Sequence, residues 1–487
     1  MKHLRSITSI LLTIALLFCA FALPSGAVDA TVSNISCTVN GDTSSCRGFC
    51  WYTPDNTDSA VIIRDSLGQD VTASLTTSFD CTEFDGMYCH KATVCGLAAG
   101  ETYTYVVGNG EAWSGEGVFT TDNGDDSVDF ISVGDVQATP LENFQRAAAV
   151  VDKALEMMPN PDFFSMLGDF TNDCTEEEWG NYFTAFKDIN ARTTLVPVAG
   201  NHDEKKINSF FNHFSLDSSA SVSNFNGVNY SYDVGNAHIA VVNTNDILSI
   251  SLTQMDWLRN DMKSTDKDWK IVFMHKSPYT LGKDGKWPDA QYLKYSLCDV
   301  IDETGVDLVM SGHDHMYLRT KPVSARKEAQ DGAVYVLGGT AGTKRYELRT
   351  VLIDTFMPKD LIAANVVQKD GYGNYFDGET WDNTDPANIG GCFETVSIRG
   401  GELTLNAYIV SDSDGSVKNI DSFTLSKETG QNKATYEGDN TVSVVKYIAQ
   451  MPISLARFAG YAFFMWLPKF ITMIPEIIRV YRETDTF

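Results

Sequence analysis

Basic residues are scarce in this chain of 487 residues. Lysine and arginine number 37 against 64 acidic residues, so the net charge is −27. Such a surface repels the phosphate backbone of nucleic acids, and we expect no nucleic-acid partner. Histidine is scarcer still, with eight residues in all. A place where two histidines lie close together in sequence therefore calls for a chemical explanation.

The N-terminus lacks acidic residues. Residues 1–27 have a basic start, an apolar stretch and small residues from Ser25 to Ala27, which is the pattern of a secretory signal peptide. Cleavage near Ala27 removes Lys2 and Arg5 and no acidic residue, so the net charge goes from −27 to −29. We therefore expect a secreted or extracytoplasmic protein.

The C-terminal tail, residues 441–487, has an uncharged run that is too short to cross a bilayer. It follows a polar linker, residues 427–440. Several basic residues of the tail fall near one helical face, so we interpret the tail as an anchor that lies on a membrane surface. One alternative is a helix packed on the protein itself. The third is a membrane span, which would contain Arg457.

Cysteine is concentrated near the start of the chain. One of the ten cysteines lies in the signal peptide, and six of the remaining nine are Cys37, Cys46, Cys50, Cys81, Cys89 and Cys95. In an exported protein this density predicts disulfides, although the sequence does not choose the pairing. The other three are too scattered to form a soft-metal site: Cys174, Cys298 and Cys392. Since nine is odd, at least one thiol is free or pairs between molecules.

Two different patterns divide the remaining chain. Residues 28–121 contain short alternating runs separated by turn residues, which predicts an all-β sandwich similar to a fibronectin type III domain. Residues 128–426 alternate apolar runs with segments of helical pattern, which predicts a layered α/β domain. The polar insertion at residues 368–391 either covers a site or decorates the surface.

Each apolar strand of the second domain ends in polar residues that can bind a metal. The segments SVGDVQ, GDFTND, GNHD, MHKSPY and SGHDH carry Asp135, Asp169, Asn201, His202, His275, His313 and His315. The strand ends of a parallel-type sheet lie side by side, so we expect these residues to converge. Imidazole and carboxylate together suit zinc, iron or manganese, and two ions bridged by one carboxylate suit phosphoryl transfer.

In this order the five segments resemble the calcineurin-like metallophosphoesterases, and the β-sandwich in front resembles their purple acid phosphatase branch. The resemblance implies an N-terminal β-sandwich followed by a four-layer αββα catalytic domain. It also implies two divalent or mixed-valence metal ions, with iron, manganese and zinc left open.

The same resemblance implies a role for each residue. One metal would be held by Asp135, Asp169 and His315, and the other by Asn201, His275 and His313, with Asp169 as the bridge. His202 would contact the phosphate and give a proton to the leaving group. Asp203 would orient His202.

The chain departs from these families at two positions. The tyrosine that purple acid phosphatases have three residues after the second aspartate is Asn172 here, so we expect no purple charge-transfer band. Other branches have a histidine two residues after the first aspartate, where this chain has Gln137. Each of the two residues is either a metal ligand or a residue that supports the ligands without binding the metal. For Gln137 we favour the supporting or structural role.

The leading hypothesis is an exported binuclear-metal hydrolase, acid phosphatase-like, that cleaves small phosphomonoesters with a metal-activated hydroxide. The first alternative keeps the metals but cleaves phosphodiesters or nucleotide pyrophosphates, and the second is a degenerate binding protein. Oligomeric state does not follow from the sequence. We interpret His238 as a structural histidine, and Tyr279 and Tyr317 either line the substrate pocket or pack inside the protein.

Overall fold

The computed structural model describes residues 32–427, with the exception of 207, 223–228, 247–249, 287, 348–356, 369–372, 377–378 and 383–388. The predicted signal peptide and C-terminal tail lie outside the described residues, and so does nearly all of the predicted linker. In the described part of the chain no helix is both long and apolar enough to cross a membrane.

The first part of the described chain is a β-sandwich. One face consists of β1 (Ser33–Thr38), β2 (Cys46–Thr53), β5 (Met87–Cys95) and β4 (Thr76–Phe84). The other is a sheet of β3 (Ala60–Arg64), β6 (Thr102–Gly108) and β7 (Gly117–Thr120). Buried and partly exposed side chains alternate along β6, as expected for a strand with one face toward a core. Phe49, Trp51 and Tyr105 fill that core.

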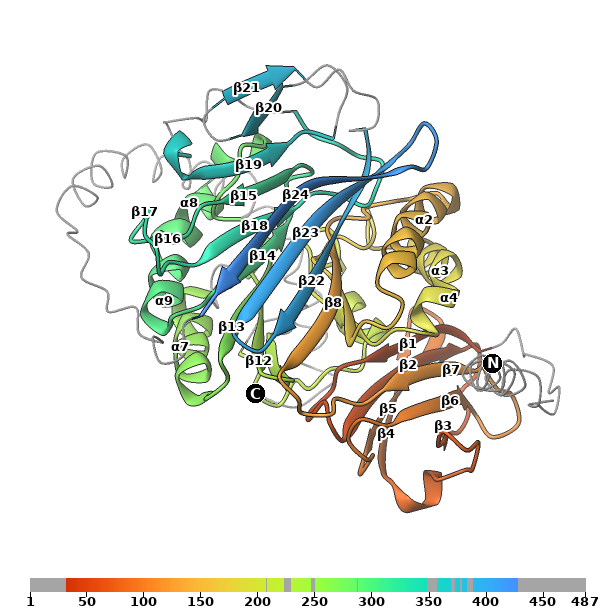
Figure 1. Cartoon of the computed structure of the whole chain (residues 1–487). Coiled ribbons are helices and arrows are strands. Elements are labelled where there is room, and N and C mark those ends of the chain that lie inside the picture. The colour runs from red at the N-terminus through yellow and green to blue at the C-terminus, as the bar shows by residue number, and fades with distance from the viewer. Residues whose placement is uncertain are drawn as a thin grey trace, which may run out of the picture.

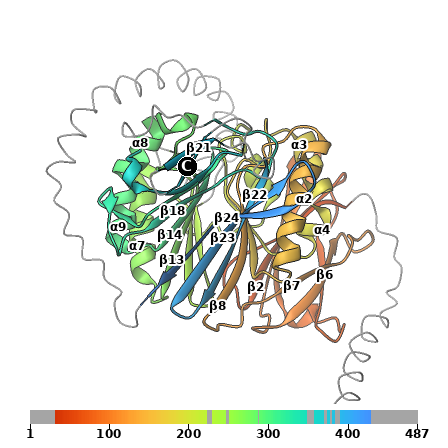
Figure 2. The same cartoon turned by 45° about the horizontal axis from the view of Figure 1, so that its top comes forward.

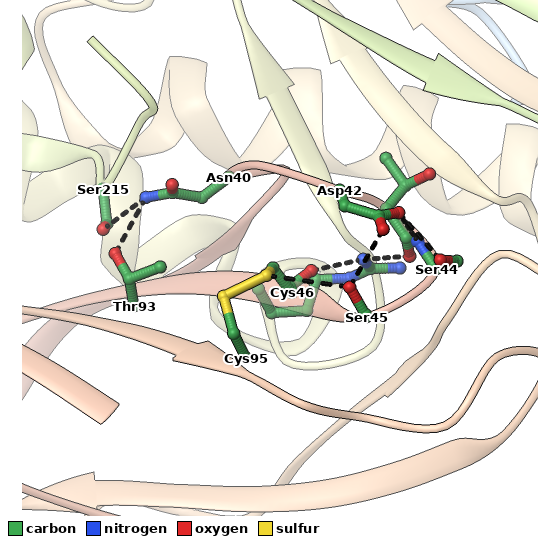
Figure 3. Close-up of a disulfide and its surroundings, with 10 residues drawn as sticks. Asn40, Asp42, Ser44, Ser45, Cys46, Thr93, Cys95 and Ser215 are labelled. Carbon is green, nitrogen blue, oxygen red and sulfur yellow. Dashed lines mark hydrogen bonds between the residues drawn. A yellow bond between two sulfur atoms is a disulfide. The ribbon is translucent and has the colours of Figure 1, made fainter. Parts of the chain in front are cut away.

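A disulfide between Cys46 and Cys95 joins β2 to β5, where the two residues lie directly opposite each other (Figure 3). The neighbouring turn is held by Asp42, whose carboxylate accepts hydrogen bonds from Ser44 and Ser45. The expectation of disulfides is confirmed for this pair, and the other cysteines of the described residues are free thiols.

The second part of the chain contains two large sheets. In the first, β8 (Ser127–Val133), β9 (Phe163–Met166) and β10 (Leu195–Pro197) run parallel. Three antiparallel strands extend this sheet beyond β8: β22 (Gly390–Arg399), β23 (Glu402–Ser411) and β24 (Val417–Ser426).

The centre of the second sheet is also parallel, with β12 (Ala237–Val242), β13 (Trp269–Lys276), β14 (Leu308–Gly312) and β18 (Val334–Gly338). Its flanking strands are β11 (Tyr230–Val234), β15 (Tyr317–Thr320), β19 (Ile362–Val366), β20 (Gly373–Phe376) and β21 (Glu379–Asp382). β20 and β21 come from the polar insertion, so part of it extends the edge of this sheet.

Helices cover the outer face of each sheet, which gives the predicted αββα layers (Figures 1 and 2). On one side are α2 (Leu141–Met157), α3 (Glu176–Ala185) and α4 (Lys187–Asn190), and on the other are α7 (Met255–Ser264), α8 (Pro288–Tyr295) and α9 (Leu297–Thr304). Phe130 and Phe273 meet between the sheets, with ring centroids 5.7 Å apart. A second core, with Val272 and Ile301, lies between the second sheet and its helices.

The sandwich and the α/β part share one sheet, which the sequence did not predict. β1 pairs in parallel with β10 at Thr38 and Leu195, so four sandwich strands continue the β8–β9–β10 sheet to give ten strands. Asn40 also donates a hydrogen bond of 3.1 Å to Ser215, which follows α5 (Ser209–His213). The sandwich therefore supports β10, after which Asn201 and His202 lie.

Candidate metal centre

The predicted metal-binding residues lie at or just after the carboxyl ends of five strands from both sheets. They are Asp135 after β8, Asp169 after β9, Asn201 and His202 after β10, His275 on β13, and His313 and His315 after β14. Because the two sheets face each other, residues from separate strand ends meet between them. This is the convergence that the strand-end pattern predicted.

The backbone is strained at this place. Asp135, Gln137, Asp169 and His313 have φ angles of 38°, 39°, 52° and 79°, in the left-handed region that side chains disfavour. Each such residue costs roughly 1–3 kcal/mol, and such strain concentrates at functional sites. Four of these conformations around one cluster indicate that the fold holds the side chains in place at a cost in stability.

Two groups of side chains are each close enough to hold one metal ion. The first consists of Asp135, Asp169 and His315, and the second of Asp169, His275 and His313, with the candidate ligand atoms of each group within 4.8 Å of one another. Asp169 belongs to both groups. A carboxylate shared in this way is suited to bridge two ions.

The first group has buried polar atoms that make no hydrogen bond within the described part of the protein. They are Oδ1 of Asp135 and Nε2 of His315, and Oε1 of Gln137, two residues after Asp135, is likewise buried without a hydrogen bond in the described structure. The Asp135 and His315 atoms are 3.5 Å apart. Nδ1 of His315 donates to the carbonyl oxygen of Lys344, which leaves Nε2 to face Asp135. Buried acceptors without donors are costly, and a cation would satisfy them.

The second group is arranged around His275. Its Nδ1 donates a hydrogen bond of 2.8 Å to the carbonyl oxygen of Leu167, so Nε2 faces the site. This Nε2 lies 3.1 Å from Oδ1 of Asn201, 3.3 Å from Oδ1 of Asp169 and 3.2 Å from Nδ1 of His313. Nε2 of His275 thus lies close to three other potential ligand atoms, and the four atoms come from four different strand ends.

The electrostatics of the centre favour positive charge. Burial alone would lower the pKa of His275, but Asp169 and Asp135 raise it to about 9. Burial alone would raise the pKa of Asp169, but His275, His202 and His313 hold it well below its usual range. The carboxylate of Asp169 therefore stays ionised in the interior and stabilises a cation beside it.

His202 lies beside this centre without being part of either group. Its main-chain N–H donates 2.8 Å to Oδ1 of Asp169, and its ring Nδ1 donates to the carbonyl oxygen of Asn172. The Asn172 side chain turns to Asp173 instead, at 2.8 Å. In this arrangement Asn172 contacts His202 through its main chain and makes no described contact with the metal groups.

Asp203 occupies a different place from the one expected. Instead of the His202 ring it contacts main-chain N–H groups, accepting from Gly200 at 2.9 Å and from Thr171 at 3.3 Å. Burial and the neighbouring Asp169 raise the pKa of Asp203 well above its usual range. Asp203 thus ties the segment after β10 to the segment after β9, and the ring of His202 is oriented by Asn172.

Other residues of the centre were missed by sequence reasoning. Oδ2 of Asp284 lies 3.7 Å from Nε2 of His313, on the far side of the ring from His275. The ring of Tyr346 stacks on His315, with centroids 4.2 Å apart and planes 10° apart. Asp284 lies in a short 3-10 helix and Tyr346 in a loop, and neither follows a strand end, so no local signal in the sequence marks them.

The remaining predicted residues have structural surroundings. His238 is buried between Asp233 and Asp261, at 2.7 and 2.9 Å, in agreement with a structural histidine. Tyr279 is buried against Tyr335, and Tyr317 donates 2.7 Å to Asp421. For the two tyrosines, packing is the alternative that the structure favours.

Two family models match the chain. Residues 128–317 match the calcineurin-like phosphoesterase family, and residues 32–121 match the purple acid phosphatase N-terminal domain. The chain carries a calcineurin-like phosphoesterase domain preceded by a purple acid phosphatase N-terminal domain. Its phosphoesterase domain therefore includes every candidate ligand described above.

Similar proteins include purple acid phosphatases. Purple acid phosphatase 21 of Arabidopsis thaliana is 23% identical over 288 residues, which cover 56% of this chain and 62% of the relative. Purple acid phosphatase 15 of the same organism is matched over 32% of its length. Acid phosphatase type 7 of Danio rerio is 25% identical over 321 residues, 57% of this chain and 68% of the relative. The chain thus spans less than two thirds of the first two.

Solved structures share the fold. The purple acid phosphatase from yellow lupin (Lupinus luteus) seeds aligns with a TM-score of 0.64 at 15% identity, over 82% of this chain and 75% of that one. The structure of PhoD aligns with a TM-score of 0.57 at 11% identity, over 82% and 91%. The β-sandwich followed by a layered phosphoesterase domain is therefore an arrangement that known proteins also have.

Proposed function

We propose that the protein is a metal-dependent hydrolase of phosphoric esters that acts on phosphomonoesters. The observation that carries the proposal is the position of Asp169, which lies in both groups of candidate ligands. The acid phosphatase names of the relatives support the same reaction class.

The residues fit two metal ions. One ion would be held by Asp135, Asp169 and His315, and the other by Asp169, Asn201, His275 and His313. Gln137 is a further candidate ligand on the first ion, because its buried Oε1 makes no hydrogen bond in the described structure. When bound, iron, manganese or zinc ions would neutralise phosphate oxygens and supply an activated water.

His202 is placed to protonate the leaving group. Because its Nδ1–H donates to the carbonyl of Asn172, Nε2 can give a proton only from the doubly protonated imidazolium form of the ring. Its main-chain bond to Asp169 keeps the ring beside the carboxylate shared by both metal groups. His202 would therefore act as general acid on the ester oxygen while water attacks phosphorus from the opposite side.

Export is part of the proposal and rests on the N-terminal sequence pattern. The Cys46–Cys95 disulfide supports it, because disulfides persist in oxidising compartments. Attachment of the C-terminal tail to a membrane surface is proposed on its sequence alone.

The decisive experiment combines metal analysis with hydrolysis of nitrophenyl phosphate. We expect about two metal ions per chain and activity that is lost to a chelator and restored by a divalent ion. Asp169→Asn is expected to lose activity and most of the metal. The matched control is Asp152→Asn on α2, where the carboxylate only pairs with Arg192. Two tightly bound ions in the Asp169→Asn variant would refute the bridging role.

A further inference from the structure

Three lysines from separate segments lie beside the metal centre, and we call them the lysine rim: Lys205, Lys283 and Lys344. Lys205 follows His202, Lys283 begins the short helix η3 (Lys283–Lys286), and Lys344 follows β18. The chain as a whole has a net charge of −27. Three ammonium groups gathered at one place on so acidic a protein offer an anion a set of binding partners there.

Two of these lysines lie near the ring of Tyr346, which contacts a residue of the first metal group. One face of its ring is stacked on His315. Nζ of Lys283 lies 4.0 Å and Nζ of Lys344 5.9 Å from the centroid of the same ring. The main chain of Lys344 is also anchored there, since its carbonyl oxygen accepts from Nδ1 of His315. Both ammonium groups therefore lie near a tyrosine ring that itself stacks on the candidate ligand His315.

Lys205 lies on the side of the general acid. Its Nζ donates 2.5 Å to the carbonyl oxygen of Asn172, the same atom that accepts from the His202 ring. The lysine rim therefore reaches from the leaving-group side of the centre to the first metal group.

The lysines differ in how far carboxylates neutralise them. Lys205 pairs with Asp173 at 2.9 Å, and Lys283 is 3.9 Å from Asp284. Lys344 is exposed and has no ion pair with a carboxylate of the described residues. An unpaired ammonium beside a second ammonium is a repulsive arrangement, which an anionic group would relieve.

We propose that the lysine rim binds a second anionic group of the substrate, so that the preferred substrates are small molecules with at least two phosphates. This inference rests on the proposed phosphoesterase function. The metal centre would take the scissile phosphate, and Lys283 and Lys344 would take the other. The second phosphate is attached in one of two ways. In a hexose bisphosphate it is attached through a carbon skeleton and the scissile group is a phosphomonoester, whereas in a nucleoside diphosphate it is attached directly and the scissile bond is a phosphoanhydride.

The test compares paired substrates in the wild-type protein and in the Lys283→Met/Lys344→Met double variant. The pairs are a hexose bisphosphate with its monophosphate and a nucleoside diphosphate with its monophosphate. We expect wild-type kcat/KM to be about tenfold higher for the doubly phosphorylated member of at least one pair, as two charge-assisted contacts would give. That preference should shrink in the double variant and at high ionic strength. The pair that shows it identifies how the second phosphate is attached.

The matched control is Lys321→Met, because Lys321 pairs with Glu328 beyond the end of β15 that lies away from His315. It should keep the wild-type preference. Equal preference in the wild type and the double variant would overturn the proposal, and so would an equal loss for both members of each pair. If the double variant misfolds, the exposed Lys344→Met alone carries the same test.

Binding separates this proposal from the proposed function. Calorimetric titration of the metal-loaded wild-type protein with the hexose bisphosphate and monophosphate needs no turnover. Tighter bisphosphate binding that Lys344→Met abolishes, in a protein without hydrolysis, would support the lysine rim and refute the hydrolase. Hydrolysis without any bisphosphate preference would refute the lysine rim alone.

Discussion

The carbonyl oxygen of Asn172 accepts a hydrogen bond from Nδ1 of His202, while the Asn172 side chain turns to Asp173. The main chain at position 172 therefore orients the candidate general acid, whatever side chain stands there. The loop is fixed by the start of α3, where Thr175 and Glu178 form a capping box and Glu178 accepts from the main chain of Asp173 at 2.7 Å.

Removal of the Asn172 side chain should matter little. We expect Asn172→Ala to lower kcat by no more than about threefold, because the carbonyl that holds His202 remains. The half-buried side chain contacts Asp173, and substitutions that break no important contact shift free energies by about 0.5 kcal/mol. Steady-state kinetics with nitrophenyl phosphate check this. A hundredfold loss together with a lower metal content would mean that the side chain itself is a ligand.

Removal of the His202 ring should depend on the leaving group. His202→Ala is expected to slow an alkyl phosphate by about 10²–10⁴-fold, the usual contribution of a general acid. Nitrophenyl phosphate should be affected far less, since its leaving group needs no proton. The two kcat/KM ratios are the measurement, and equal losses would exclude the general-acid role.

Gln137 should contribute to one metal site only. Its Oε1 is buried and makes no hydrogen bond in the described structure, and its main-chain N–H donates 2.7 Å to the carbonyl of Asp169. Gln137→Ala is expected to weaken one of two metal-binding steps by about tenfold or more in a calorimetric titration. Gln137→Glu, which keeps an oxygen there, should preserve it. Unchanged affinities in the alanine variant would assign Gln137 a purely structural role.

Cys50 and Cys89 should form a second disulfide when the protein is made in an oxidising compartment. Their Sγ atoms lie 3.7 Å apart on β2 and β5, the two strands that the Cys46–Cys95 disulfide also joins. A hydrogen bond from Cys50 lowers the pKa of Cys89, so Cys89 is the thiol that ionises first. Each thiol gives up one proton and one electron, which a disulfide of the oxidising partner takes up as it is reduced.

Alkylation under denaturing conditions without reductant, followed by mass spectrometry, tests this pairing. Cys50 and Cys89 should stay unlabelled, whereas the exposed Cys81 is the internal control and should be labelled. Labelling of all three would contradict the prediction.

His238 should make stability depend on pH. Burial alone would lower its pKa, but hydrogen bonds with Asp233 and Asp261 raise it to about 9, above the unfolded value of 6.5. Its contribution is therefore complete below about pH 6.5 and is lost as pH rises through about 9. His238→Gln should lower Tm by about 3 °C at pH 6 and by less at pH 10. An equal decrease at both pH values would show that the charge contributes nothing.

Much of the fold and of the centre was predictable, because both depend on patterns of residues that are close together in the sequence. Alternation in the first part predicts strands, and apolar runs alternating with helical segments predict the layered second part. Strand ends that carry Asp135, Asp169, His275 and His315 predict convergence, because parallel strands bring their carboxyl ends together. The contacts of Asp203 could not be read from the sequence, because neighbouring residues after a turn point in different directions and its carboxylate accepts from the main chain of Gly200 and Thr171.

Local sequence is enough to account for the residue types at the strand ends, and with them a centre rich in carboxylate and imidazole. The three-dimensional fold set the pairing of β1 with β10 in a single sheet, because that pairing links Thr38 to Leu195 across the whole first part of the chain. It also decided which ring nitrogens face the centre, through carbonyl groups such as those of Leu167 and Lys344. These choices depend on contacts between distant segments, and no local pattern of side chains records them.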